Sequence, residues 1–214
     1  MFLLAFLIAC SNPAENKSSA ELVKPEAAPV EAPAAPAAPA DPAAAAAPAG
    51  PEVNLTGTVG FTGSKVTKSH DGTFGAWSGK AVVANGKLQS VRFEVDINTL
   101  TTDSAKLDGH LKSEDFFNAA TFPKATFVSQ SVTDGAPADS KLEGANATVE
   151  GALTMHGVTQ TVRFPAIITS DATATSAKTE FVINRKDFGI VYPGKPDDLI
   201  RDEVVIKVDV KTGV

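Results

Sequence analysis

The sequence predicts an all-β domain of about eight strands with one short helical excursion at about residues 103–117. Apolar and polar residues alternate over 91–98 and again over 204–211. This two-residue period is typical of strands that bury one face. Asn85 and Gly86 form an expected tight hairpin turn, because both tolerate positive φ. Strands at hairpin spacing fit a closed antiparallel barrel, and by periodicity alone they fit a two-sheet sandwich equally well.

The other expected elements follow in chain order. Further strands are predicted around Val59–Phe61, Phe74–Val82, 125–133, 142–155, 162–168 and 181–183. Within the helical excursion, Asp103 can cap the helix, and Leu107 and Leu111 lie four apart on one face. Pro165 cannot donate to a strand ladder, so it should mark a bulge or a place where neighbouring strands part.

The stretch 181–210 carries the most distinctive pattern in the chain. Two strand patterns enclose a long loop that is punctuated by glycine and proline but still contains Phe188, Ile190, Val191 and Tyr192. Long loops with this much apolar side chain are usually functional, so we interpret this one as a lid or rim over a cavity. Four carboxylates in and beside the loop are expected to form a solvated acidic rim: Asp197, Asp198, Asp202 and Glu203.

Four segments in order resemble the YceI-like family of secreted bacterial proteins. They are FTGSKVTKSHDGTFGAWSGK (61–80), LTTDSAKLDGHLKSEDFF (100–117) with FPKATF (122–127), LTMHGVTQTVRFP (153–165) and NRKDFGIVYPGKPDDLIRDEV (184–204). Each motif alone is unspecific, whereas four in the family's order over residues 55–214 are specific. The resemblance favours a closed lipocalin-like barrel over a sandwich. It also implies a polyisoprenoid or another long apolar ligand, and it allows a homodimer.

The N-terminal quarter has a different composition from the rest of the chain. Residues 1–9 are apolar and too short to span a bilayer, which fits the core of a secretory signal. The chain's one cysteine, Cys10, follows directly in a Leu-Ile-Ala-Cys sequence that resembles a lipobox, so we expect 1–10 to be a signal ending in a lipidated cysteine. Residues 11–53 are rich in Ala and Pro and predict a disordered spacer, roughly 80 Å long if extended, before a barrel domain at 54–214.

Composition and motifs exclude several classes of function. The formal net charge of −6 does not provide the basic footprint of a nucleic-acid-binding protein. His70, His110 and His156 do not have metal-ligand spacing, and the chain lacks a GxSxG motif. We therefore expect no catalysis and no cofactor other than a bound apolar lipid. The alternatives are a metal- or haem-dependent enzyme that uses these histidines, and a ligand-free interaction module with a filled barrel.

The favoured hypothesis is a lipid-anchored protein on the periplasmic side of the cell envelope. It would bind, store or transport a polyisoprenoid, an isoprenoid quinone or a fatty amide. Because Ser11 rather than Asp follows Cys10, the resemblance to enterobacterial lipoproteins favours the outer membrane. The predicted cavity lining is Phe61, Phe74, Val91, Phe93, Val95, Leu107, Leu111, Phe116, Phe117, Phe127, Leu153, Phe164, Phe181, Ile183, Val204, Ile206 and Val208. Ala76, Ala147 and Gly151 would leave room between them. The predicted mouth is His70, Asp71, Arg185, Phe188, Ile190, Val191, Tyr192, Lys195 and Arg201, of which His70, Asp71, Arg185, Lys195 and Arg201 would meet a polar headgroup.

Overall fold

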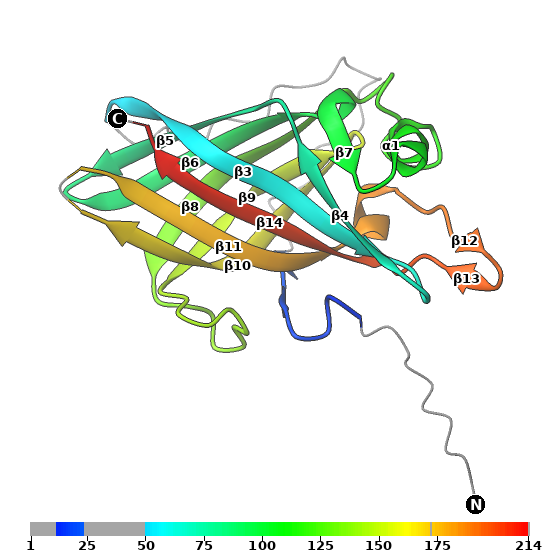
Figure 1. Ribbon diagram of the computed structural model, residues 1–214. Coiled ribbons are helices and arrows are strands. Elements are labelled where there is room, and N and C mark those ends of the chain that lie inside the picture. The colour runs from blue at the N-terminus through cyan, green and yellow to red at the C-terminus, as the bar shows by residue number, and fades with distance from the viewer. Residues whose placement is uncertain (1–11, 24–49, 172, 214) are drawn as a thin grey trace, which may run out of the picture.

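A closed antiparallel barrel forms the body of the protein in the computed structural model, which describes residues 12–23, 50–171 and 173–213 (Figure 1). Its eight wall strands are β3 (Glu52–Ser64), β5 (Trp77–Ala84), β6 (Lys87–Asp96), β8 (Lys124–Asp134), β9 (Ala147–Met155), β10 (Val158–Ser170), β11 (Thr175–Asn184) and β14 (Glu203–Thr212). Each strand pairs with the next, and β14 closes the ring by pairing with both β11 and β3. The predicted lipocalin-like barrel is therefore confirmed, and the sandwich alternative is wrong.

Two hairpin turns have the backbone geometry that their residues favour. Asn85 and Gly86 have φ values of 54° and 70° between β5 and β6. His156 and Gly157 have φ values of 51° and 74° between β9 and β10. Left-handed conformations at two central positions match the right-handed twist of adjoining strands, and these turns keep consecutive strands in register.

The barrel wall splits between β10 and β11, as Pro165 predicts. These two strands pair only where 167–170 faces 175–178. Pro165 lies just before the paired part, and its carbonyl accepts a hydrogen bond from the Thr179 hydroxyl at 2.6 Å. Because proline has no N–H to donate, the ladder does not continue toward residue 158.

Residues 12–23, here called the N-terminal wall segment, occupy this split. Strand β1 (Ser18–Ser19) pairs in parallel with β11, and β2 (Glu21–Leu22) pairs antiparallel with β10. Ala14 covers Val182 and Val205 on the outer side of the wall. In Figure 1 the segment is the dark blue chain beneath β10 and β11. The disordered spacer predicted for residues 11–53 is therefore wrong for 12–23 and for 52–53, where β3 begins, while residues 11 and 24–49 lie outside the described part of the chain.

The composition of the N-terminal wall segment suggests disorder, although the segment is paired with the barrel, and the reason is physical. Its residues are small and polar and cannot build a core alone, but an open barrel seam supplies the partners. The Ala20 N–H donates to the Val182 carbonyl at 2.7 Å, and the Val23 N–H donates to the Thr161 carbonyl at 2.9 Å. Backbone pairing depends little on side-chain hydrophobicity, so the segment's composition does not reveal it.

The remaining elements gather at one end of the barrel. Strands β4 (Ser69–Phe74) and β7 (Leu100–Thr102) extend the wall beside β3, with η1 (Ile97–Thr99) before β7. Helix α1 (Ala105–Lys112), the turn η2 (Arg185–Phe188) and the hairpin of β12 (Gly194–Lys195) and β13 (Asp198–Leu199) lie at the same end (Figure 1). No helix in the described ranges is both long and apolar enough to cross a membrane.

The helix is shorter than predicted and begins at a different cap. Ser104, not Asp103, is the N-cap, and the helix ends at Lys112, with turns over 114–117 making up the rest of the predicted excursion. The Asp103 carboxylate is bonded to His70 and Lys68, so it is not free to cap the helix. The Asp108 carboxylate accepts hydrogen bonds from the N–H of Thr102 at 2.7 Å and from the hydroxyl of Thr102 at 2.6 Å. These bonds fix the first turn of the helix to β7.

Candidate functional site: an apolar cavity with a polar mouth

The barrel interior contains a cavity of about 620 Å³. Its lining extends from α1 and the β12–β13 hairpin at one end to Thr212 and Leu55 near the other end of the wall. Most of the lining is aliphatic or aromatic. A largely apolar cavity of this size falls in the range of small-molecule sites, and the filled-barrel alternative is wrong for this chain.

Three phenylalanine rings form the central part of the wall. The rings of Phe164 and Phe181 are stacked, with centroids 4.0 Å apart and planes 7° apart. Phe127 lies beside Phe164 at a centroid distance of 5.5 Å. A Cβ at Gly151 would come within 2.7 Å of the Phe127 ring. Because Gly151 has no side chain, the ring lies against the wall instead of crossing the cavity.

Other small residues leave room as well, but they are not the two alanines that the sequence predicts. Ala81, Ala125, Ala166 and Ala177 line the cavity, whereas Ala76 and Ala147 do not. All seventeen side chains predicted as lining do lie on the cavity wall. Their contact with a ligand stays a prediction. Alternation identified the strand residues among them, because every second residue of a barrel strand faces the interior, whereas Leu107 and Leu111 were expected from their shared helix face.

Three residues predicted at the mouth lie elsewhere. Phe188 is fully buried at 0% exposure in the core behind the cavity, and Val191 points to solvent with 63% exposed. The Asp71 carboxylate faces outward and accepts hydrogen bonds from Thr62 and Lys207. A loop sequence lacks the strict alternation that separates inner from outer positions in a strand, so these sides could not be assigned from the sequence.

Arg185 borders the cavity, but it holds the loop together and is not available to a headgroup. The residue is 4% exposed. Its guanidinium donates to the carbonyls of Ile190 at 2.7 Å and Arg201 at 3.1 Å, and to the Asp202 carboxylate at 3.1 Å. Burial lowers the pKa of Arg185 from its ordinary value, and Asp202 opposes this shift. The headgroup role predicted for Arg185 is therefore wrong, although its place on the cavity wall agrees with the prediction.

The predicted acidic rim is also wrong for two of its members. Asp198 is bonded to Lys65 and Thr67. Asp202 pairs with Arg185 and, at 2.8 Å, with the Lys186 ammonium. The hydrogen bond from Lys65 holds the pKa of Asp198 below its ordinary value. Neighbouring cations thus neutralise two carboxylates of the expected rim.

An aromatic cluster forms part of the mouth. The His110 ring lies edge-on to Phe116 and Tyr192 at centroid distances of 5.0 and 5.1 Å. Phe116 and Tyr192 are 5.3 Å apart. His110 is absent from the predicted mouth, although residues 107, 110 and 111 share one helix face and this spacing could have placed it there. Tyr192 and Ile190 lie where predicted.

The three histidines do not converge. His70 is bonded to Asp103, His110 to Asp115 at 3.0 Å, and His156 to the Phe188 carbonyl at 3.1 Å. Within the part of the chain that the structure describes, no three His, Cys, Asp or Glu side chains are grouped to hold a metal ion. Each histidine instead fixes a local element.

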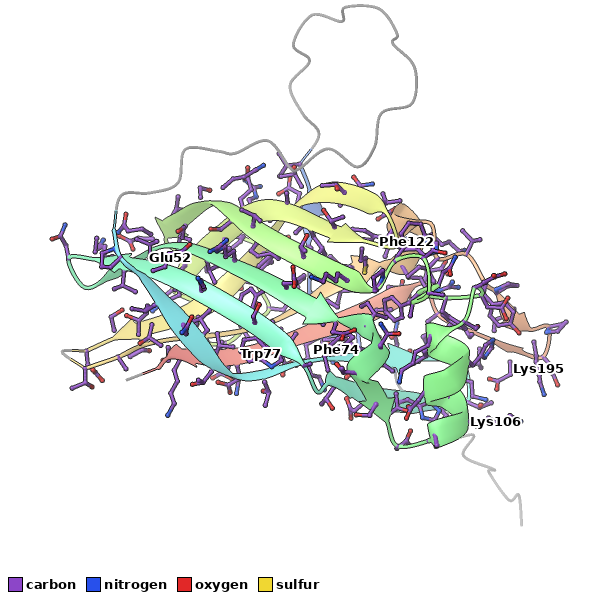
Figure 2. All side chains as sticks on the ribbon, turned by 90° about the horizontal axis from the view of Figure 1, so that it is seen from above. Glu52, Phe74, Trp77, Lys106, Phe122 and Lys195 are labelled. Atoms are coloured by element: carbon purple, nitrogen blue, oxygen red, sulfur yellow. The ribbon has the colours of Figure 1, made fainter. Side chains whose placement is uncertain are left out.

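The mouth also contains polar side chains that the sequence pattern does not predict there. The lining there includes Ser64, Lys65, Ser104, Lys106 and Asp198 in addition to the predicted His70, Lys195 and Arg201. Figure 2 shows Lys106 and Lys195 at the end of the molecule opposite Glu52. These residues come from β3, β4, α1, β12, β13 and the loop positions beside them, so only the tertiary structure brings them together.

Comparisons with known proteins agree with this architecture. In sequence, the chain is 36% identical to a UPF0312 protein of Shewanella denitrificans over 129 residues, covering 56% of this chain and 63% of the relative. It is 35% identical to a UPF0312 protein of Pseudomonas fluorescens over 134 residues, covering 58% and 65%. The chain thus spans a little under two thirds of the length of these curated relatives.

Solved structures share the fold at low identity. Burkholderia cenocepacia BcnA aligns with a TM-score of 0.58 and 23% identity, covering 72% of this chain and 96% of that one. A polyisoprenoid binding domain from Saccharophagus degradans, implicated in plant cell wall breakdown, aligns with a TM-score of 0.56 and 16% identity, covering 72% and 91%. The sequence model of the YceI-like domain matches residues 53–212. With the barrel, the motif order and this match in agreement, the chain belongs to the YceI-like domain family.

Proposed function

We propose that this protein binds a long apolar molecule, such as a polyisoprenoid, an isoprenoid quinone or a fatty amide, inside the barrel. The observation that carries the proposal is the continuous apolar cavity lined by Phe127, Phe164 and Phe181. The polyisoprenoid binding domain from Saccharophagus degradans, which shares the fold, supports this ligand class. Burying a hydrocarbon chain contributes about 0.8 kcal/mol per CH₂ before ordering costs, so affinity needs no specific polar contact.

We further propose that the protein binds its ligand without catalysis and acts in the bacterial cell envelope, lipid-anchored through Cys10. The apolar run before Cys10 supports this location, and both features lie outside the described residues. One residue separates Cys10 from Asn12, where the N-terminal wall segment begins. An anchor at Cys10 would therefore hold the barrel close to the membrane instead of at the end of a long spacer.

Ligand uptake with a blocked cavity tests the proposal. Ala166 lines the cavity and is 2% exposed, so Ala166→Phe places a ring in the space the ligand would occupy. Native mass spectrometry of the full chain with geranylgeraniol should show uptake by the wild type and a loss of about tenfold or more in the variant. Val128→Phe, at an exposed position outside the cavity, is the matched control and should bind as the wild type does. Equal uptake by the wild type and Ala166→Phe would refute binding in the cavity.

A further inference from the structure

The mouth of the cavity has a charge opposite to that of the whole protein. The chain has a formal net charge of −6. Among the described residues that line the cavity, however, Asp198 supplies the one carboxylate, and this carboxylate is already paired with Lys65. Lys106, Lys195 and Arg201 also line the cavity, and none of them forms an ion pair with another described residue. The mouth therefore presents three uncompensated cations.

Buried polar atoms without partners lie beside these cations. Ser64 is only 7% exposed, and its hydroxyl has no hydrogen-bond partner among the described residues. The Arg201 Nε is likewise buried and unpaired. The two residues adjoin, because the Arg201 N–H donates to the Ser64 carbonyl at 2.9 Å. Buried polar groups are nearly always hydrogen-bonded, so two unpaired ones on a cavity wall point to an acceptor that a ligand supplies.

The cations occupy different elements around the opening. Lys106 is on α1, Lys195 is on β12, and Arg201 lies between β13 and β14 next to the end of β3. Lys106 and Lys195 are exposed, and Arg201 is partly buried. An anionic group at the opening would thus meet exposed ammonium groups on its solvent side and a guanidinium on its inner side. Guanidinium and ammonium groups favour phosphate and carboxylate acceptors.

We propose that the mouth, with Ser64, Lys106, Lys195 and Arg201, is a binding site for the anionic headgroup of an amphiphile whose chain occupies the barrel. The headgroup chemistry is a phosphate ester or a carboxylate on a prenyl or acyl chain. This inference rests on the proposed function and adds to it a selection by charge. A neutral chain would fill the apolar cavity equally well, but it would leave the buried donors unpaired.

The test compares two probes that share one chain. Geranylgeranyl monophosphate and geranylgeraniol, delivered from cyclodextrin to the full-length protein, should differ in Kd, with the phosphate bound about tenfold or more tightly at low salt. The preference should shrink as salt is raised, because exposed lysines are screened. The double substitution Lys106→Gln with Lys195→Gln, and separately Arg201→Gln, should reduce the preference by weakening phosphate binding much more than geranylgeraniol binding. Retained alcohol binding also shows that each variant is folded.

Lys112→Gln is the matched control, because Lys112 is on the same helix but does not line the cavity. It should keep the full preference. Equal affinity of the wild type for the two probes would overturn the headgroup site while leaving the apolar cavity function intact. A phosphate preference that persists in the double variant and in Arg201→Gln would also overturn it. If the wild type binds neither probe, the proposed function itself fails.

Discussion

Replacing Arg185 by methionine should destabilise the protein strongly although no ligand contact is removed. The buried guanidinium donates to the carbonyls of Ile190 and Arg201 and to the Asp202 carboxylate. Methionine fills a similar volume but donates nothing, so the buried Ile190 carbonyl loses its partner and the loop over residues 189–202 loses its internal support. An unsatisfied buried acceptor costs about 1–3 kcal/mol, and breaking a buried pair costs about 3–5 kcal/mol.

The Asp202 side chain is 36% exposed, so water compensates part of the lost pairing and we expect a total loss of about 3 kcal/mol. Urea unfolding of the wild type and Arg185→Met measures this loss directly. Arg185→Lys keeps the charge without the planar fork and should recover only part of it. Lys186→Met removes an exposed partner of the same Asp202 and should cost less than about 1 kcal/mol. If Arg185→Met lowers the free energy of unfolding by less than about 1 kcal/mol, the structural role of Arg185 is refuted.

Two further predictions concern the wall and its charges. Ala20→Pro removes the N–H that donates to the Val182 carbonyl. It should therefore lower the free energy of unfolding by about 1 kcal/mol or more and speed hydrogen exchange in the N-terminal wall segment. The control Ala20→Ser keeps the donor and should change neither quantity. Unchanged exchange in the proline variant would show that the segment does not seal the wall. The hydrogen bond from Lys207, with that from Thr62, holds the pKa of Asp71 below its ordinary value of 3.8. A depressed folded-state pKa stabilises the protein above pH about 4, and this contribution is lost as pH falls through the folded-state pKa. Asp71→Asn should therefore make the free energy of unfolding fall less steeply with pH in that acid range. The effect should be small, because the Asp71 side chain is 75% exposed. An unchanged dependence of the free energy of unfolding on pH would contradict the pairing with Lys207.

The sequence alone determined most of the barrel strands and which of their side chains face inward, although it merged β4 and β5 into one strand. In a barrel strand the position along the chain fixes the face, so alternation placed Phe93, Phe127 and Ile206 on the cavity wall without knowledge of the fold. It also marked the turn at Asn85 and the parting of strands at Pro165, because each depends on the backbone preference of a single residue. The choice of a barrel over a sandwich needed the family resemblance.

Only the tertiary structure decided what depends on chain segments meeting. Residues 12–23 look like spacer because pairing through backbone groups leaves little trace in composition, and the split that they fill exists only once the ring has closed. The roles of Arg185 and Phe188 follow from the folding of an irregular loop, where no period assigns a side. The polar mouth, with Ser64 beside Arg201, is assembled from separate elements whose distances the order of residues does not contain.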